Sequence, residues 1–571
     1  MAVVRPSSSP PRSRRLRRLV PLLVLGVGAF AGGVITGARH EPTERRLANR
    51  FAQAWEREQY ADMYAMLTPQ ARAETSLRAF ARAYRRANTT ATVKQLTAGR
   101  AHDPVEEAVE VPMTASTRIF GELEASVTLP LGEDVGGEPA IEWAPHLVFP
   151  GLRGGEKLSR EMELPERGTI RARDGSRMAY GEDRLSDLDP EASEIAGRIG
   201  PAPPERADEL AARGIPAEAP VGISGLEREF DAELAGSPGG KLLAGTRVLA
   251  SVMRERGRSV RTTIDPDVQR AAVQALAGRY GGIAAVRPRT GEVLALAGVA
   301  FSAPQPPGSV FKIVTLTAAL EAHTLRRNET FPVQTAATLE GIELENANGE
   351  SCGGSLINSF AHSCNSVFAP MGAELGAEKL VAAAERFGFN EDPRLQGAAR
   401  STIPAASEIG DDLAVGSTAI GQGKVLTTPL QMALIAAAIG EDGRRMQPTL
   451  RRGERAEASQ ATRPGIARFV DRAMRAVVTS GTGVGARVPG VVVAGKTGTA
   501  ELRSTVSEDP EPVEPDEPPP EDDPTDTDAW FAAYAPAGKP RIAVAVLLIA
   551  QGVGGEVAAP VAAQVIDAAV G

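Results

Sequence analysis

The first part of the chain changes from a helical to a strand-like pattern of apolar residues. From residue 44 to about 91, apolar residues recur every four positions, as at Leu47 and Phe51, which predicts two amphipathic helices. From 91 to 148, apolar and polar residues alternate, which predicts strands. Residues 41–155 are therefore expected to form a small α+β domain.

The pattern is irregular over residues 156–260, which mix short strands with charged, proline-rich and helical pieces. We interpret this stretch as a spacer with little chemistry of its own. From residue 261 onward, apolar runs suited to buried strands alternate with apolar helices. The strand-like runs are 283–286, 293–296, 491–493, 530–534 and 542–550. Helices between strands predict an α/β domain of about 310 residues, large enough for a substantial core.

The N-terminus predicts a membrane anchor. Six arginines and no acidic residue precede residue 19, and the twenty residues 19–38 carry no charge. A helix needs about 20 residues to cross the hydrocarbon core of a bilayer. The arginines place the basic tail 1–18 in the cytoplasm and the rest of the chain outside it. A cleaved signal peptide is the alternative, because residues 29–31 read Ala-Phe-Ala.

Composition narrows the classes of protein. The 571-residue chain has 42% hydrophobic residues, which excludes wholesale disorder and a collagen-like chain. Two cysteines exclude a disulfide scaffold, and five histidines without an HExxH motif argue against a protease-type zinc site. We expect no metal and no cofactor. Outside the membrane Cys352 and Cys364 can be bonded or free, and the sequence leaves both alternatives open.

One short segment concentrates the negative charge. The net charge is −9, and residues 508–528 alone contain eleven acidic residues, seven prolines and no basic residue. Self-repulsion and missing backbone donors predict an extended, solvated insertion at 505–527. A patterned binding segment is the alternative.

The first candidate for chemistry is a lysine in an apolar helix. Only eight of the 63 basic residues are lysine, so a lysine away from the surface stands out. Residues 309–320 predict the start of a buried helix, and Lys312 is their only charged residue. Ser309 lies three positions earlier, on the same face. Burial disfavours the ammonium form of Lys312, so its amine can activate the Ser309 hydroxyl as a nucleophile.

Two further sites are less specific when each is taken alone. The run 495–499 reads Gly-Lys-Thr-Gly-Thr after a β-branched segment, and a strand with paired glycines lets a ligand approach closely. A solvated lysine at the end of a strand is the alternative for Lys496. Ser363 and Asn365 precede an apolar stretch, where capping of a helix is the simpler interpretation.

Together the three sites resemble the SxxK, SxN and KTG motifs, in that order, of penicillin-binding proteins and serine β-lactamases. The matching residues are Ser309 and Lys312, Ser363 and Asn365, and 496–498. Surrounding phrases narrow the resemblance to class B penicillin-binding proteins, the monofunctional peptidoglycan D,D-transpeptidases. Those phrases lie at 225–227, 262–265, 290–295, 421–423 and 481–483.

The resemblance implies a multidomain α+β and α/β fold. Its parts would be a single transmembrane helix, a cone-like N-terminal extension as in low-affinity, resistance-type members (41–155), a mixed α/β pedestal of dimerisation type (156–260) and a serine transpeptidase domain (261–571). The last domain resembles β-lactamases, with a central antiparallel sheet between helices.

The resemblance also implies a role for each matching residue. Ser309 would attack the D-Ala-D-Ala carbonyl of a stem peptide, Lys312 would take its proton, and Ser363 would relay a proton to the departing D-Ala. The backbone N–H groups of Ser309 and Thr499 would form the oxyanion hole. The residues implied in substrate binding are Asn365, Lys496, Thr497, Gly498 and Thr499.

The implied partners follow from that reaction. They are stem peptides as donor and amine acceptor, β-lactams as covalent inhibitors, the membrane through one helix, and a polytopic membrane glycan polymerase. Nucleic acid is not among them. The implied location is the cell membrane, crossed once, with the bulk of the chain extracytoplasmic.

Three other functions compete with this one. The first is a Ser-His-Asp hydrolase, because residues 349–353 match the G-x-S-x-G motif of a nucleophile elbow. Such an elbow needs a hydrophobic strand before it and a helix after it. A D,D-carboxypeptidase or β-lactamase would share the three motifs without needing a basic tail, an anchor and a long stalk. A non-catalytic scaffold or β-lactam sensor would not need both lysines.

Overall fold

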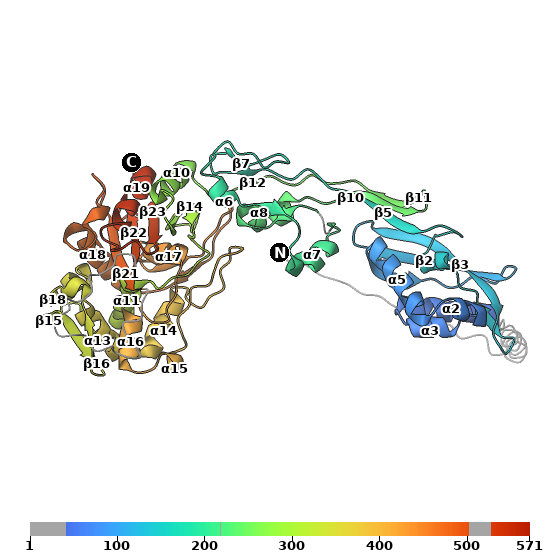
Figure 1. The fold of residues 1–571 in the computed structure, drawn as a ribbon, viewed down its shortest axis with the longest axis horizontal. Helices are drawn as coiled ribbons and strands as arrows, with labels where there is room; N and C mark the ends of the chain where they lie inside the picture. The colour runs from blue at the N-terminus through green and yellow to red at the C-terminus, as the bar shows by residue number, and fades with distance from the viewer. Residues whose placement is uncertain (1–40, 217–218, 502–526) are drawn as a thin grey trace, which may run out of the picture. The chain divides into compact units, whose positions relative to one another are not determined.

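The computed structural model describes residues 41–216, 219–501 and 527–571. By their contacts the residues form two units, one of residues up to 162 with 240–252, the other of 163–239 with 253–571 (Figure 1). The predicted tail 1–18 and anchor 19–38 lie outside the described residues. Within the described ranges no helix is both long and apolar enough to cross a membrane.

From residue 41 onward, the first unit has four helices before its sheet, where the sequence pattern predicted two. The breaks have local causes: Thr68 and Ser76 each accept a hydrogen bond from the backbone N–H three residues on, which caps a new helix. Pro69 occupies the first turn of α4, where a missing N–H costs nothing. The helices are α2 (Thr43–Glu56), α3 (Tyr60–Ala65), α4 (Pro69–Glu74) and α5 (Leu77–Ala91).

A four-stranded antiparallel sheet follows, in the order β1-β2-β3-β4. Its strands are β1 (Val93–Ala98), β2 (Ala108–Thr117), β3 (Glu122–Glu133) and β4 (Pro139–Ile141), and a 3-10 turn, η1 (Pro145–Val148), comes after them. Alternate residues of β2 are buried, such as Val109 and Val111, and they pack with Trp55 and Phe80 from the helices. The predicted α+β arrangement of helices followed by a sheet is confirmed.

Part of the predicted spacer belongs to the first unit. Strands β5 (Leu158–Glu163), β10 (Gly239–Ala244) and β11 (Arg247–Val252) form a three-stranded sheet. Leu242 is fully buried among the apolar side chains of this unit. The chain therefore leaves the first unit after β5 and returns to it with β10, after 75 intervening residues. No local sequence pattern predicts this return.

The second unit begins with short elements held by buried charges. Its strands are β6 (Ile170–Arg171), β7 (Arg177–Ala179), β8 (Ile199–Gly200), β9 (Val221–Gly222) and β12 (Val260–Arg261). Its helices are α6 (Ser193–Ala196), η2 (Pro204–Arg206), α7 (Ala207–Ala212), α8 (Gly225–Glu229) and α9 (Asp231–Leu234). Two acids, Glu227 and Asp231, are 1% exposed and pair with arginines from distant positions in the sequence.

A five-stranded antiparallel sheet forms the centre of the rest of this unit, in the order β14-β13-β23-β22-β21. The strands are β13 (Gly281–Val286), β14 (Val293–Gly298), β21 (Ala494–Glu501), β22 (Thr527–Ala535) and β23 (Ile542–Leu548). The predicted central antiparallel sheet is confirmed. The prediction of a strand at 491–493 is wrong, because Val492 is half exposed and the edge strand begins only at Ala494.

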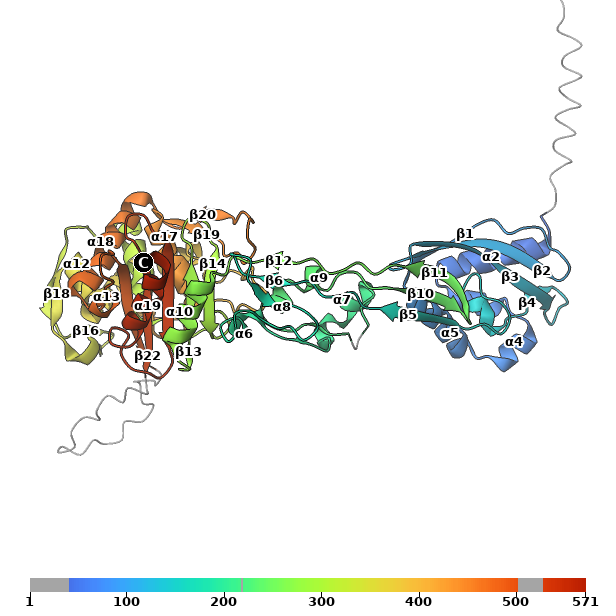
Figure 2. The ribbon, with the colours of Figure 1, turned by 90° about the horizontal axis from the view of Figure 1, so that it is seen from above.

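Helices cover both faces of this sheet. On one face Phe531 and Val544 pack with α10 (Pro266–Leu276) and α19 (Ala558–Val570), which Figure 2 shows together beside the strands. On the other face Trp530 and Tyr534 join the apolar cluster of α11 (Lys312–Ala322), α17 (Pro429–Gly440) and α18 (Pro464–Ser480). The alternation along β22 thus separates two apolar layers, as expected for a sheet buried on both faces.

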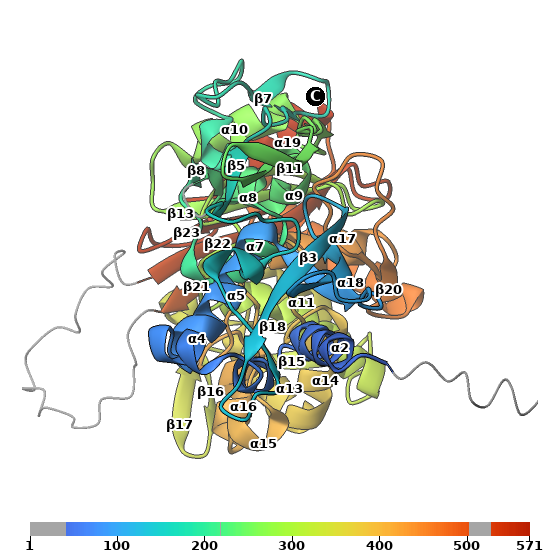
Figure 3. The ribbon, with the colours of Figure 1, turned by 90° about the vertical axis from the view of Figure 1, so that its right-hand side faces the viewer.

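The remaining elements form a helical part around α11. They are β15 (Thr330–Gln334), β16 (Ala336–Leu339), β17 (Ile342–Glu345), η4 (Ala347–Gly349), β18 (Cys352–Ser355), α12 (Leu356–Ala361), α13 (Asn365–Leu375), α14 (Ala377–Arg386), α15 (Ala406–Ile409), α16 (Asp412–Ala419), β19 (Arg444–Met446), β20 (Ala458–Gln460) and η5 (Val484–Ala486). Figure 3 shows the β16–β17 hairpin next to α13 and α16. Of the predicted insertion at 505–527, only Thr527 is described, as the first residue of β22.

Candidate active site

Ser309 lies in a tight turn that packs against the edge strand. The turn is the 3-10 segment η3 (Gly308–Phe311), directly before α11. Gly308 has φ +53°, and a Cβ there would lie 2.5 Å from the carbonyl oxygen of Thr499. Only glycine allows this approach. The backbone of the nucleophile candidate therefore lies beside strand β21.

Lys312 is fully buried one turn later. Its Nζ lies 2.7 Å from the carbonyl oxygen of Ser363, 2.6 Å from Asn365 Oδ1 and 3.3 Å from Ser363 Oγ. Across the described part of the chain, no carboxylate lies within ion-pair distance of this amine. Burial, helped by the nearby positive charge of Lys496, holds the pKa of Lys312 well below its ordinary value.

The hydrogen bonds of Lys312 suit an uncharged amine. A neutral amine has two N–H bonds, which can be donated to the Ser363 carbonyl and to Asn365 Oδ1, the two nearest oxygens. Its lone pair is then free to accept a proton. In a 3-10 turn, side chains three residues apart project from the same side. The hydrogen bonds of the Lys312 amine go to Ser363 and Asn365, and none joins it to Ser309 within the described residues.

Ser363 and Asn365 do more than cap a helix. Cys364 is the N-cap of α13, but no side chain there donates or accepts a capping hydrogen bond. Ser363 Oγ instead lies between the amines of Lys312 and Lys496, and Asn365 Nδ2 donates to the carbonyl of Glu345 at 2.7 Å. The capping interpretation is wrong, because the partners of both side chains come from elsewhere in the fold.

Lys496 is the second buried cation of the site. It is 0% exposed, and its Nζ donates to Ser363 Oγ at 2.8 Å and to the carbonyl of Thr497 at 3.0 Å. Burial lowers the pKa of Lys496 from 10.5 to about 7. The interpretation of Lys496 as a solvated lysine is therefore wrong. Ser363 Oγ contacts both amines and can pass a proton between them.

In the part of the chain that the structure describes, strand β21 presents one edge without a neighbouring strand. It is the last strand in the sheet order and pairs there with β22 alone. Gly498 is required here, since a Cβ would lie 2.8 Å from the Pro307 carbonyl oxygen. The hydroxyl oxygens of Thr497 and Thr482 lie 2.6 Å apart. Free backbone groups on such an edge can pair with an extended peptide.

The structure brings most of the predicted residues into one cluster. Hydrogen bonds link Lys312, Ser363, Asn365 and Lys496 directly, while Gly308 and Gly498 hold the turn of Ser309 against β21. Sequence reasoning missed Thr482 as a site residue, although its Gly-Thr-Gly phrase was noted. No group of acidic, histidine or cysteine side chains suited to a metal occurs among the residues with described positions.

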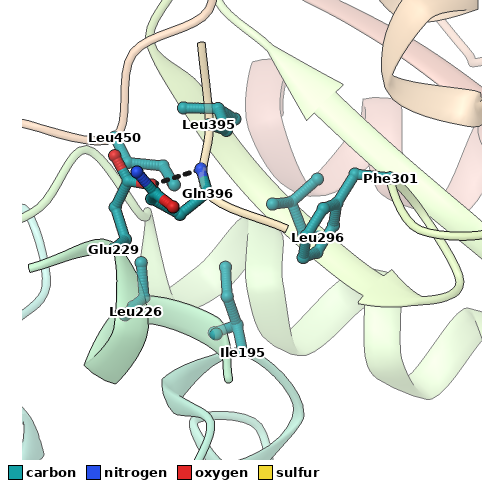
Figure 4. Close-up of a pocket in the computed structure, with 9 residues that line it drawn as sticks. Ile195, Leu226, Glu229, Leu296, Phe301, Leu395, Gln396 and Leu450 are labelled. Carbon is teal, nitrogen blue, oxygen red and sulfur yellow. Dashed lines mark hydrogen bonds between the residues drawn. The ribbon is translucent and has the colours of Figure 1, made fainter. Parts of the chain in front are cut away.

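Two other places lack this chemistry. The G-x-S-x-G match at 349–353 is no nucleophile elbow, because a 3-10 turn precedes Ser351 and a strand follows it. A separate cavity of about 10 Å³ between α8 and β14 has mainly apolar walls, where Glu229 accepts a hydrogen bond from the Gln396 N–H at 2.6 Å (Figure 4). That volume holds about one water molecule, so it is no substrate site.

Comparison with known proteins agrees with this geometry. Residues 281–567 match the penicillin binding protein transpeptidase domain, and residues 43–156 match an NTF2-like N-terminal transpeptidase domain. The chain therefore belongs to the penicillin-binding protein transpeptidases. It is a penicillin-binding transpeptidase, a serine-type acyltransferase. The resemblance drawn from the sequence motifs is confirmed, including its N-terminal part.

Individual relatives cover much of the chain. Peptidoglycan D,D-transpeptidase PbpA of Mycolicibacterium smegmatis is 33% identical over 411 residues, which are 61% of this chain and 79% of that protein. The crystal structure of PBPA from Mycobacterium tuberculosis is 28% identical, with a TM-score of 0.56, and covers 71% of this chain and all of that one. A ceftriaxone acyl-enzyme complex of the same M. tuberculosis protein is 27% identical, covers 71% of this chain and 99% of that one, and also has a TM-score of 0.56.

Proposed function

We propose that this protein is a peptidoglycan D,D-transpeptidase that forms its acyl-enzyme on Ser309. The observation that carries the proposal is the buried amine of Lys312, one turn after a serine. Ser363 and Asn365 hold this amine, and no carboxylate from the described ranges pairs with it. Burial lowers the pKa of an amine in this setting and so favours the uncharged form, which can accept a proton. A hydroxyl beside such a base is an activated nucleophile.

Acylation would begin when Ser309 Oγ bonds to the carbonyl carbon of the penultimate D-Ala. Lys312 takes the hydroxyl proton, and Ser363 relays a proton to the amine of the terminal D-Ala as the peptide bond breaks. The N–H groups of Ser309 and Thr499 stabilise the developing oxyanion, a contribution of about 3 kcal/mol per donor. The packing of the Ser309 turn against β21 supports this pairing of donors.

Strand β21 would bind the donor peptide along its free edge. Thr497 and Thr499, with Gly498 between them, would bind the terminal carboxylate. Lys496 supplies positive charge next to them, and Asn365 would hold a substrate amide. The free strand edge and the buried cation support this assignment, since a carboxylate taken from water needs both hydrogen bonds and opposite charge.

The second half-reaction would need an acceptor amine. An amine of a neighbouring stem peptide would attack the acyl-enzyme, form the cross-link and release Ser309. We place this reaction outside the cytoplasmic membrane, with residues 19–38 as anchor, 1–18 as cytoplasmic tail, 41–155 as N-terminal extension, 156–260 as pedestal and 261–571 as catalytic domain. A polytopic glycan polymerase would be a natural partner, because it supplies the strands to be cross-linked.

β-Lactams would acylate the same serine. The ceftriaxone acyl-enzyme of the M. tuberculosis relative supports this expectation. The test uses the full chain in detergent with a fluorescent penicillin, followed by peptide mass mapping. We expect one covalent adduct on Ser309 and none in Ser309→Ala. The matched control is Ser351→Ala, which removes the exposed serine of the G-x-S-x-G match and should label normally.

Two results would change the proposal. Labelling that survives Ser309→Ala would overturn the assignment of the nucleophile. Incubation with a D-Ala-D-Ala stem peptide and an amine acceptor separates the reaction types. A cross-linked product supports transpeptidation, whereas release of D-Ala without cross-linking would identify a hydrolytic carboxypeptidase instead.

A further inference from the structure

The residue between Ser363 and Asn365 is covalently tied to another part of the fold. Cys364 forms a disulfide with Cys352, and their Cα atoms lie 5.7 Å apart. Both side chains are buried, and this bond uses both cysteines of the chain. Cys352 is the first residue of strand β18, where it pairs with Gln334 of β15. The disulfide therefore joins the turn at Ser363 to a strand.

The same stretch of chain holds the neighbouring residues by hydrogen bonds. Asn365 Nδ2 donates to the carbonyl of Glu345 at 2.7 Å, and the Ser366 N–H donates to Asn346 Oδ1 at 2.8 Å. Asn346 is buried, and its amide donates to the backbone carbonyls of Gln334, at the end of β15, and of Glu350. Residues 345–352 thus form a backing for the turn, with one covalent link and two hydrogen bonds to it.

The disulfide attaches the residue that lies between the two residues in contact with Lys312. The two hydrogen bonds attach residues 365 and 366, at the start of α13. Ser363 lies on the other side of Cys364 and has φ +61°, a left-handed conformation that is unfavourable for a residue with a side chain. Surrounding structure must hold such a residue in place. The carbonyl of Ser363 is also the acceptor that lies 2.7 Å from Lys312 Nζ.

We propose that the Cys352–Cys364 disulfide positions Ser363 and Asn365 around the Lys312 amine, so that acylation of Ser309 depends on the oxidation of these two cysteines. The cysteines touch neither substrate nor reacting atoms and act as positioning residues. This inference deepens the proposed function and rests on it. It means that the protein gains full activity only where thiols pair, as they do outside the cytoplasm.

The redox step is an exchange between thiols. Two protein thiols and one glutathione disulfide give the protein disulfide and two molecules of glutathione, with two electrons passing to glutathione and the protons staying on its thiols. The reverse reaction uses a phosphine reductant such as TCEP. The phosphine gives two electrons to the disulfide and becomes the phosphine oxide with oxygen from water, and the two protons of that water end on the two cysteine thiols.

The test compares reduced and oxidised forms of the same full-length protein. The chain is produced in a reducing cytoplasm, purified in detergent with TCEP and desalted, and its two thiols are counted with a thiol reagent. Half is then oxidised with glutathione disulfide. The matched control is Cys352→Ala, which keeps Cys364 as a thiol but cannot form the bond. Acylation by a fluorescent penicillin is followed over a range of concentrations, below the unfolding temperature of every form.

We expect the acylation rate constant of the reduced protein to be about 10- to 100-fold lower than that of the oxidised protein, the usual effect of a small misplacement of catalytic groups. Oxidation should restore it in the wild type and not in Cys352→Ala. The concentration for half-maximal rate should change little, because β21 is intact in both forms.

Three results would overturn the inference. Equal rate constants in the two forms, even with a lower unfolding temperature for the reduced one, would show that the bond only stabilises the fold, and would leave the proposed function standing. If the two thiols do not pair on oxidation, acylation of Ser309 cannot depend on their disulfide. Absence of any label on Ser309 in both forms would overturn the proposed function together with this inference.

Discussion

Two regions of the second unit bury charge in opposite ways. In the short elements after β5, Glu227 and Asp231 are almost fully buried, and Arg167 bonds to both acids, at 2.7 Å and 2.8 Å. Arg184 pairs with Glu227, and Arg206 pairs with Asp231 at 2.9 Å. Burial raises the pKa of Asp231, but the hydrogen bond from the Gly222 N–H and the charge of Arg167 lower it by more. The pKa therefore lies below its ordinary value, and Asp231 stays ionised. Every charge in this cluster has a partner of opposite sign.

The active site does the reverse. Lys312 and Lys496 are both buried, both touch Ser363 Oγ, and neither has a carboxylate partner among the residues that the structure describes. Burial therefore lowers the pKa of each amine. Pairing thus fixes a buried charge in the structure, whereas a buried amine left unpaired loses its proton more easily. The first region is suited to rigidity and the second to chemistry.

The largest expected effect comes from Lys312→Arg. Guanidinium keeps the positive charge but cannot give up its proton. This variant therefore tests the need for a base at this position while the charge stays the same. We expect the rate of penicillin acylation to fall about 10³-fold, the contribution of a general base. The measurement is labelling of the full chain over time, with circular dichroism as a check on folding. Lys379→Arg, on the exposed side of α14, is the matched control, and near-normal labelling of Lys312→Arg would contradict the assignment of the base.

The next largest effect tests the paired cluster. Glu227→Gln removes one negative charge and leaves two arginines, 11% and 10% exposed, without full compensation. We expect the free energy of unfolding to fall by about 3–5 kcal/mol, the usual cost of breaking a buried ion pair. Denaturant unfolding measures it, with Glu194→Gln on the exposed face of α6 as control. A loss under 1 kcal/mol, or a slower acylation of the folded fraction, would show that the two regions do not differ as described.

For Lys496→Met we expect a smaller change in the free energy of unfolding, and an increase instead of a loss. The pKa of Lys496 is about 7 in the folded protein and 10.5 in the reference state. The unfolded chain therefore binds more protons between these values, and wild-type stability rises with pH from about 7 to 10.5. Near pH 7 the variant should be more stable by about 1.4 kcal/mol or more, the value of one pKa unit. Urea unfolding at pH 7 and pH 10 checks this, and a variant less stable than the wild type at pH 7 would contradict it.

The smallest effect is expected from deleting residues 505–526. Glu501 of β21 and Thr527 of β22 are register partners. After the deletion, residues 502–504 would join the two strands, and a loop of three residues can close a hairpin. If the lysines of the site have no carboxylate partner, removing the acidic segment should leave the acylation rate unchanged within about twofold, because exposed charges are screened by salt. A clear change at moderate salt would show that these acids act on the site.

The sequence alone determined the parts of the site that lie close together in the chain. Ser309 and Lys312 are three residues apart in an apolar helix start, so their shared face follows from helix geometry. The strand pair β13–β14 followed from two apolar runs and a turn, and the antiparallel sheet followed from the family resemblance. Local pattern failed at 491–493, where three β-branched residues suggested a strand that begins only at Ala494.

Only the tertiary structure decided what the SxN residues do. In the sequence Ser363 and Asn365 favour a helix cap, but their partners Lys312 and Lys496 lie 51 to 133 residues away. The pairing of the two cysteines and the hydrogen bond between Thr482 and Thr497 were equally open. The physical reason is that helices and turns arise from contacts within a few residues, whereas the desolvation that changes a lysine into a base depends on every element packed around it.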